Sequence, residues 1–94
     1  MEPFIQLHPD DNVVIALQPL DRGSVITWKR QEIKLNAAIG FGHKIAIKSI
    51  EQAAKVLKYG LPIGSATKAI AAGDHVHIHN LESEYAINNI KQQN

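Results

Sequence analysis

Short apolar stretches, separated by turn-forming residues, run along most of the chain and predict β-strands. Residues 13–17 form an unbroken, β-branched apolar run, which is typical of a buried strand. Polar and apolar residues alternate over 44–48 and again over 74–80, as in strands with one face in the core. In the last of these strands, Val76 and Ile78 are expected to face the core. The full set of expected strands is 13–17, 24–28, 32–35, 44–48, 55–59 and 74–80.

A weak internal repeat supports this interpretation. An apolar residue is followed three positions later by Gly or Ala, and three positions after that by Val or Ile. The three copies are Leu20-Gly23-Ile26, Ile50-Ala53-Val56 and Ile70-Gly73-Val76. Each copy is expected to hold an apolar anchor, a tight turn that tolerates glycine, and a second anchor that returns to the core. Such units build short strands with corners rather than long helices.

Two segments carry weak helical signals. Residues 49–55 could form about two turns with Ser49 as the N-cap. Residues 65–72 are rich in alanine but lie between Gly64 and Gly73. For both segments the alternative is a short turn between strands, which we favour slightly.

The composition fits one small domain. The chain has 94 residues, of which 45% are hydrophobic but only 5% aromatic, so aliphatic and β-branched side chains must fill the core. We expect a mostly β fold over residues 1–81, with one or two short helical turns. Residues 82–94 are expected to be a C-terminal tail that faces a partner or is disordered.

Charge and cysteine content exclude several classes of function. Ten basic and nine acidic residues are interspersed and give a net charge of +1, so no basic patch predicts nucleic-acid binding. The absence of cysteine excludes disulfides and thiolate metal sites. No apolar stretch approaches the ~20 residues of a membrane helix, and the first residues do not resemble a signal peptide. We therefore expect a cytoplasmic protein that binds neither nucleic acid nor membrane.

Histidine is the most informative residue type. His75, His77 and His79 alternate along the expected closing strand and would share one face, because residues two apart on a strand point the same way. Such neighbouring imidazoles can bind one divalent ion or one anion, and two of them leave open positions for water and a chelating substrate. The alternative is an exposed polar edge that binds nothing.

Two further segments could contact an anionic substrate. The glycines of segment 40–44 place His43 at a strand entrance, where a neutral imidazole can move a proton, and Lys44 beside it could meet a carboxylate. Lys58 could neutralise the same anion and the Tyr59 hydroxyl could donate to it. The alternatives are an ordinary glycine-rich turn and a surface lysine beside a half-buried tyrosine.

Four segments together resemble the N-terminal region of altronate dehydratase in order and spacing. They are Asp11-Asn12-Val13 with Ala16-Leu17, Gly42-His43-Lys44-Ile45-Ala46, Lys58-Tyr59-Gly60 with Pro62-Ile63-Gly64, and Gly73 through Asn80. The resemblance covers nearly the whole chain up to Asn80. It implies an SAF domain, a β-clip of short strands.

The resemblance also implies a function. The chain would be the small subunit, or the N-terminal domain, of a hydro-lyase of hexuronate catabolism that removes water from D-altronate to give 2-keto-3-deoxygluconate. It would act with a large catalytic subunit or domain on a sugar-acid substrate. The resemblance leaves open whether the chain also forms a homo-oligomer. The implied cofactor is a divalent metal, iron or manganese, bound mainly by the partner chain or in part by this one. The residues implied are His43 for catalysis, Lys44, Lys58 and Tyr59 for substrate binding, and His77 and His79 for metal binding.

Two other functions remain open. The small subunit of sulfolactate sulfo-lyase is similar as well, including a histidine-rich final strand. Alternatively, the chain is a non-catalytic module that binds a sugar acid or assists assembly.

Overall fold

The computed structural model describes residues 2–83, and every regular element in this part of the chain is a β-strand. The strands are β1 (Phe4–Ile5), β2 (Val13–Ala16), β3 (Val25–Trp28), β4 (Gln31–Lys34), β5 (Lys44–Ala46), β6 (Lys55–Lys58), β7 (Leu61–Ala66), β8 (His75–Val76) and β9 (Leu81–Ser83). The expected mostly β fold is confirmed, but neither helical turn considered over 49–55 and 65–72 is present. No helix within residues 2–83 is long and apolar enough to span a bilayer. Most of the expected tail, from residue 84 onward, lies outside the described residues.

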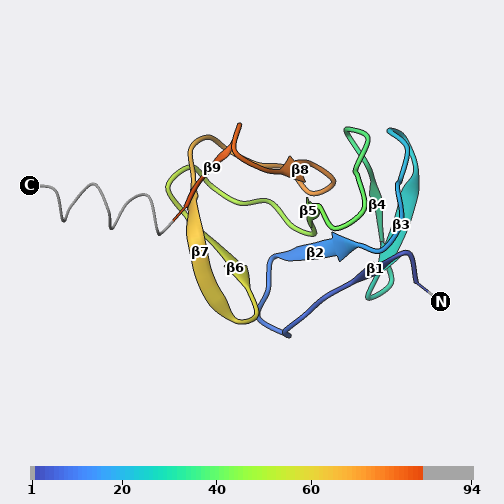
Figure 1. The fold of residues 1–94 in the computed structure, drawn as a ribbon, viewed down its shortest axis with the longest axis horizontal. Coiled ribbons are helices and arrows are strands. Elements are labelled where there is room, and N and C mark those ends of the chain that lie inside the picture. The colour runs from blue at the N-terminus through green and yellow to red at the C-terminus, as the bar shows by residue number, and fades with distance from the viewer. Residues whose placement is uncertain (1, 84–94) are drawn as a thin grey trace, which may run out of the picture.

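Three small antiparallel sheets make up the domain (Figure 1). The central sheet has the strand order β1-β2-β5-β8, β3 pairs with β4, and the third sheet has the order β6-β7-β9. In Figure 1 the β3–β4 hairpin lies at one end of the central sheet and the β6–β7 hairpin at the other. The strands β5 and β8, which are distant in sequence, are hydrogen-bonded neighbours between these two ends.

The internal repeat corresponds to four similar turns, one more than the three copies predicted from the sequence. The fourth copy is Ile39-Gly42-Ile45, which has the same spacing. The backbone angle φ is positive at the middle position of every copy: 88° at Gly23, 81° at Gly42, 72° at Ala53 and 94° at Gly73. The first anchors pair two by two, since Leu20 and Ile39 exchange two backbone hydrogen bonds of 2.8 Å, as do Ile50 and Ile70. The domain therefore consists of two similar halves, each built around one hairpin.

Both hairpins close with two-residue turns of the same kind. The angle φ is 48° at Lys29 and 70° at Arg30 in one turn, and 58° at Tyr59 and 72° at Gly60 in the other. Two successive positive φ values are the mark of a type I′ turn, whose twist matches that of the flanking strands. Three of these four residues are not glycine, so each turn carries a conformational cost that other contacts must offset.

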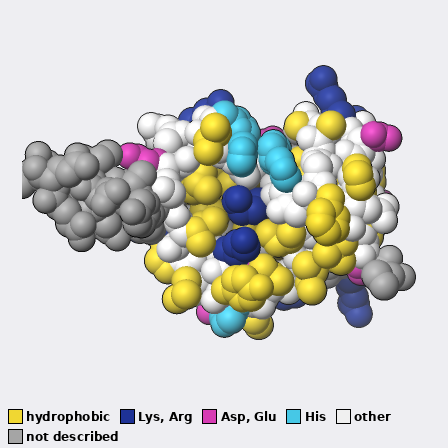
Figure 2. All heavy atoms as spheres, viewed as in Figure 1, with side chains coloured by type: hydrophobic (Ala, Val, Ile, Leu, Met, Phe, Trp, Pro, Cys, Tyr) yellow, Lys and Arg dark blue, Asp and Glu magenta, His cyan; other side chains and the backbone are white. Residues whose placement is uncertain are grey.

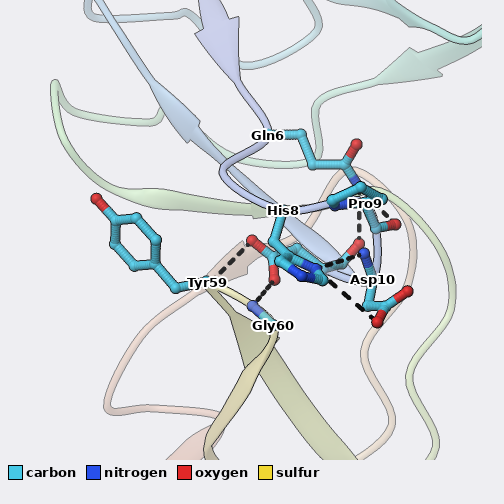
Figure 3. A network of polar contacts seen from close by, with 7 residues as sticks. Gln6, His8, Pro9, Asp10, Tyr59 and Gly60 are labelled. Atoms are coloured by element: carbon cyan, nitrogen blue, oxygen red, sulfur yellow. Dashed lines mark hydrogen bonds and ion pairs between the residues drawn. The ribbon is translucent and has the colours of Figure 1, made fainter.

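The buried carboxylate of Asp11 fixes the end of the β6–β7 hairpin, whose turn residues Tyr59 and Gly60 are labelled in Figure 3. Asp11 is only 1% exposed. Its two carboxylate oxygens accept hydrogen bonds from the backbone N–H groups of Tyr59 (3.0 Å) and Gly60 (2.7 Å). A carboxylate that accepts from two backbone amides satisfies donors that a tight turn otherwise leaves without partners. Asp11 thus offsets the strain of this turn.

The neighbouring Asn12 holds the strand that leads into the same turn. Its side-chain oxygen accepts from the N–H of Leu57 at 2.8 Å, and its side-chain nitrogen donates to the carbonyl of Lys55 at 2.9 Å. Because Asn12 directly precedes β2, these bonds tie β6 to the central sheet. The position of Lys58, the last residue of β6, is set by this attachment.

Two hydrophobic clusters fill the interior. The first contains Phe4, Val14, Ala16, Ile26, Ile33, Leu35, Ile39, Ile45 and Ile47. The second contains Val13, Ala46, Ile50, Val56, Ala66, Ile70 and Val76. Neighbouring residues on a central strand pack into different clusters, as Val13 and Val14 of β2 do. The central sheet is therefore buried on both faces, which explains the unbroken apolar run that begins at Val13.

The closing strand is shorter than its alternating sequence predicts. Only His75 and Val76 form β8, and residues 77–80 form a turn. The side-chain oxygen of Asn80 accepts from the N–H of His77 at 2.9 Å, and the backbone N–H of Asn80 donates to the His77 carbonyl at 3.0 Å. The expectation that Ile78 faces the core is wrong, because this turn leaves Ile78 83% exposed.

A matched pair of glycine variants tests how tightly the repeated turns pack. A Cβ at Gly73 would overlap the backbone carbonyl of Lys34, whereas a Cβ at Gly23 would meet nothing within 4 Å. Both residues have a positive φ, so alanine pays the same backbone cost at each position. We expect Gly73→Ala to lower the free energy of unfolding by about 1–3 kcal/mol more than Gly23→Ala does. Urea denaturation of both variants measures the difference, and equal losses would show that Gly73 is not closely packed.

Candidate functional site

Four histidines gather at the β8 edge of the central sheet. His43 directly precedes β5 and His75 opens β8, and the two strands pair with Ile45 opposite His75. His77 and His79 lie in the turn that follows β8. The ring centres are 5.0 Å apart for His43 and His75, 5.4 Å for His43 and His77, 5.4 Å for His75 and His77, and 5.6 Å for His75 and His79. Figure 2 shows histidine side chains gathered on one face, close to basic side chains.

His43 and His75 meet edge to edge. Nδ1 of His43 lies 2.9 Å from Nε2 of His75, while the ring centres are 5.0 Å apart. Both nitrogens therefore lie between the ring centres, as in a hydrogen bond in which one ring donates and the other accepts. By contrast, the rings of His75 and His77 are nearly parallel, with an interplanar angle of 9°.

The surroundings of His75 lower the pKa of its imidazole. Partial burial is the largest cause that lowers the pKa of its imidazole, and the neighbouring His43, His77, His79 and Lys44 lower the pKa further. A second positive charge in this cluster is thus unfavourable. A neutral imidazole keeps one nitrogen as an acceptor and the other as a donor.

Lys44 and Lys58 come close to one another beside the histidines. Burial lowers the pKa of Lys44, and the charge of Lys58 lowers it further. Within residues 2–83 no carboxylate lies within salt-bridge distance of either ammonium group. Two neighbouring lysines without an acidic partner form a surface that favours an anion.

A shallow groove of about 560 Å³ runs past this surface. Its walls are Lys44, Thr67, His77, Ile78, Leu81, Glu82 and Ser83. The groove brings the ammonium group of Lys44, the imidazole of His77 and the carboxylate of Glu82 together with aliphatic side chains. Such a lining fits a small molecule that has a carboxylate at one end, or an aliphatic segment of a partner.

Tyr59 is held at the hairpin turn by its backbone N–H, which donates to Asp11, and it does not line the groove. Its side chain is 63% exposed at the tip of the β6–β7 hairpin, and its hydroxyl has no hydrogen-bond partner among the described residues. In Figure 3 the phenol ring points away from His8 and Asp10, which lie on the other side of the turn. The substrate-binding role of Tyr59 stays a prediction, whereas Lys44, Lys58, His43 and His77 are brought to one region.

The described residues do not form a complete metal site. Within residues 2–83 no three His, Asp or Glu side chains are arranged to hold one ion. One nitrogen each of His43 and His75 is engaged in the contact between their rings. His77 and His79 could supply two ligands at most, so an ion would need further ligands from outside this part of the chain.

The sequence patterns missed the residues that position the site. Asp11 and Asn12 fix the β6–β7 hairpin, and Asn80 closes the turn that carries His77 and His79. For Asn80 a signal existed, because asparagine side chains commonly stabilise turns. For Asp11 and Asn12 no local signal existed, since their partners lie more than forty residues away in the chain.

Short strands joined by corner turns, with two hairpins on a shared central sheet, form the architecture expected of an SAF-type β-clip. The sequence profile of the altronate/galactarate dehydratase SAF domain matches residues 2–84, and the chain belongs to this family.

Two kinds of relative are similar to this chain. It is 46% identical over 77 residues to altronate dehydratase of Escherichia coli (strain K12), which is 82% of this chain and 16% of that protein. It is 39% identical over 83 residues to altronate dehydratase of Bacillus subtilis (strain 168), which is 88% of this chain and 17% of that protein. It is also 31% identical over 88 residues to (2R)-sulfolactate sulfo-lyase subunit alpha of Chromohalobacter salexigens, which is 86% of this chain and 94% of that subunit.

These relatives place the chain in a family of lyases. The chain spans only 16–17% of the length of the altronate dehydratases that it matches, so it is similar to one part of those longer proteins.

Proposed function

We propose that this chain acts as the SAF domain of a sugar-acid hydro-lyase that converts D-altronate to 2-keto-3-deoxygluconate together with a larger catalytic region. The observation that carries the proposal is that Lys44 and His77 line the groove, with His43 against His77 and Lys58 near Lys44, in a chain that matches altronate dehydratases. The groove is shallow and open, so the domain would supply one wall of the active site and the larger region the rest.

The chain's own residues are assigned to binding and proton transfer. The ammonium groups of Lys44 and Lys58 would hold the carboxylate of the sugar acid, because they lack an acidic partner within residues 2–83. His43 would take the proton from C2, after which the C3 hydroxyl leaves as water. The divalent metal expected for this class, iron or manganese, is assigned mainly to the larger region, with His77 and His79 as the side chains this domain would contribute.

A second candidate function is that of a sulfo-lyase small subunit. The chain covers 94% of subunit alpha of the Chromohalobacter sulfo-lyase, so its size suits that role. Altronate and sulfolactate are both 2-hydroxy acids with a leaving group on C3, and the same lysines and imidazole could serve either. The two functions are separated by combining the chain with its large catalytic polypeptide and comparing turnover of D-altronate and sulfolactate. Turnover of neither acid would overturn both candidates.

The lysine pair gives a test of substrate binding. We expect Lys44→Met to raise KM for the sugar acid about 10- to 100-fold in the assembled lyase, because a charge-assisted hydrogen bond to the carboxylate is lost. Lys48→Met is the matched control, since Lys48 is exposed and does not line the groove. Steady-state kinetics of both variants measure the effect, and an unchanged KM in Lys44→Met would exclude this carboxylate contact.

A further inference from the structure

The imidazole of His75 is placed to control which nitrogen of His43 is free. Nδ1 of His43 and Nε2 of His75 are 2.9 Å apart, so one of them carries the hydrogen that they share. When His75 accepts, neutral His43 is protonated at Nδ1, and its Nε2 lone pair is available as a base. When His75 donates, Nε2 of neutral His43 carries the hydrogen and can donate a hydrogen bond but cannot act as a base.

The backbone around His75 is suited to hold one ring orientation. His75 lies on β8 opposite Ile45, and its carbonyl accepts a hydrogen bond of 2.9 Å from the side chain of Asn80. Asn80 is itself buried and bonded to His77, so β8 and the turn after it form one connected unit. A residue on a rigid strand with buried support positions its neighbour more reliably than a residue on a free loop.

His43 is exposed to solvent. A Cβ at Gly40 would lie 3.5 Å from Cδ2 and 3.6 Å from Nε2 of His43, so glycine leaves this side of the ring uncovered where another residue would pack against it.

We infer that His75 is a positioning residue for His43: its Nε2 accepts the Nδ1–H of His43 and keeps Nε2 of His43 unprotonated, ready to act as the base. The inference rests on the proposed function for the role of His43. When Nε2 takes the C2 proton, the ring becomes positive and its Nδ1–H donates more strongly to His75. The electron pair of the C2–H bond forms the C2=C3 bond of the enol, and the C3 hydroxyl takes the proton from Nε2 of His43 and leaves as water.

The tautomer of His43 can be read directly in the full 94-residue chain. With ¹⁵N-labelled histidine rings and no added metal, at a pH where the imidazoles are neutral, NMR should show His43 protonated at Nδ1. In His75→Leu we expect a mixture of both tautomers. In His75→Gln, whose side-chain oxygen reaches about as far as Nε2, the single tautomer should return. Protonation of His43 at Nε2 in the wild type, or an unchanged tautomer in His75→Leu, would overturn the inference.

Activity gives the second measurement. In the lyase assembled with its large catalytic polypeptide, His75→Leu should lower kcat about 10- to 100-fold with KM within about twofold. His75→Gln should recover most of the loss, which a merely structural role would not predict. Wild-type kcat in His75→Leu overturns the positioning role alone. An inactive wild-type lyase overturns the proposed function and this role with it, while the NMR spectrum still decides the His43–His75 contact.

Discussion

Replacement of His43 by glutamine is expected to lower kcat of the assembled lyase about 10²- to 10⁴-fold, the usual contribution of a general base. Glutamine can still form a hydrogen bond with His75 but cannot take a proton from C2. The fold should be unaffected, because His43 is exposed and precedes β5 rather than packing in the core. Steady-state turnover of D-altronate, alongside a circular dichroism spectrum of the isolated chain, measures the two properties separately.

His8→Gln is the matched control for this prediction. His8 lies beside Gly60 at the far side of the β6–β7 turn, outside the histidine cluster, and its loss should leave kcat within about twofold of the wild type. A His43→Gln variant with nearly normal turnover would remove His43 from the chemistry. The domain would then be a binding or assembly module of the larger protein.

Removal of the Asp11 carboxylate is expected to cause the largest loss of stability. Asp11→Ala leaves the backbone N–H groups of Tyr59 and Gly60 without their charged acceptor, and each such bond is worth about 1.5–3 kcal/mol. We expect the free energy of unfolding to fall by roughly 3–5 kcal/mol, a large share of the about 5–15 kcal/mol typical of a domain. The melting temperature should drop by more than about 10 °C, as followed by circular dichroism.

Two neighbouring variants define the cause of this loss. The side chain of Asp10 is 75% exposed, so Asp10→Ala should change stability by less than about 0.5 kcal/mol. Asp11→Asn keeps one acceptor oxygen and should fall between the wild type and Asp11→Ala. Similar stability of Asp11→Ala and Asp10→Ala would mean that the hairpin does not depend on the buried carboxylate.

The features that could be predicted from the sequence are local ones. Corner turns need a positive φ, which glycine adopts without penalty, so the spacing of Gly23 and Gly73 revealed the repeat before any coordinates. The buried strand β2 was evident for a similar reason, since a strand covered on both faces must be apolar throughout, although it ends at Ala16 and leaves Leu17 of the expected 13–17 exposed.

The features that could not be predicted depend on contacts between distant segments. The alternating sequence over 74–80 is compatible with a longer strand. In the structure, however, the side chain of Asn80 closes a turn that leaves Ile78 exposed. The approach of Lys58 to Lys44 follows from the attachment of β6 to the central sheet through Asn12. No pattern within a single segment encodes these contacts, so the lysines could be proposed as separate anion contacts but not as a pair.

The four corner turns share one backbone shape but carry different chemistry. In each turn the position after the residue with positive φ is occupied by a different side chain: Ser24, His43, Ala54 and Asp74. Imidazoles lie only on the two corners that the pairing of β5 with β8 brings together. The corner-turn histidines therefore lie on one side of a domain built from two similar halves, and the other two corner turns carry none. We expect substitutions at those two turns to change thermal stability without changing catalysis, so they are the places where new functional side chains could be introduced without altering the fold.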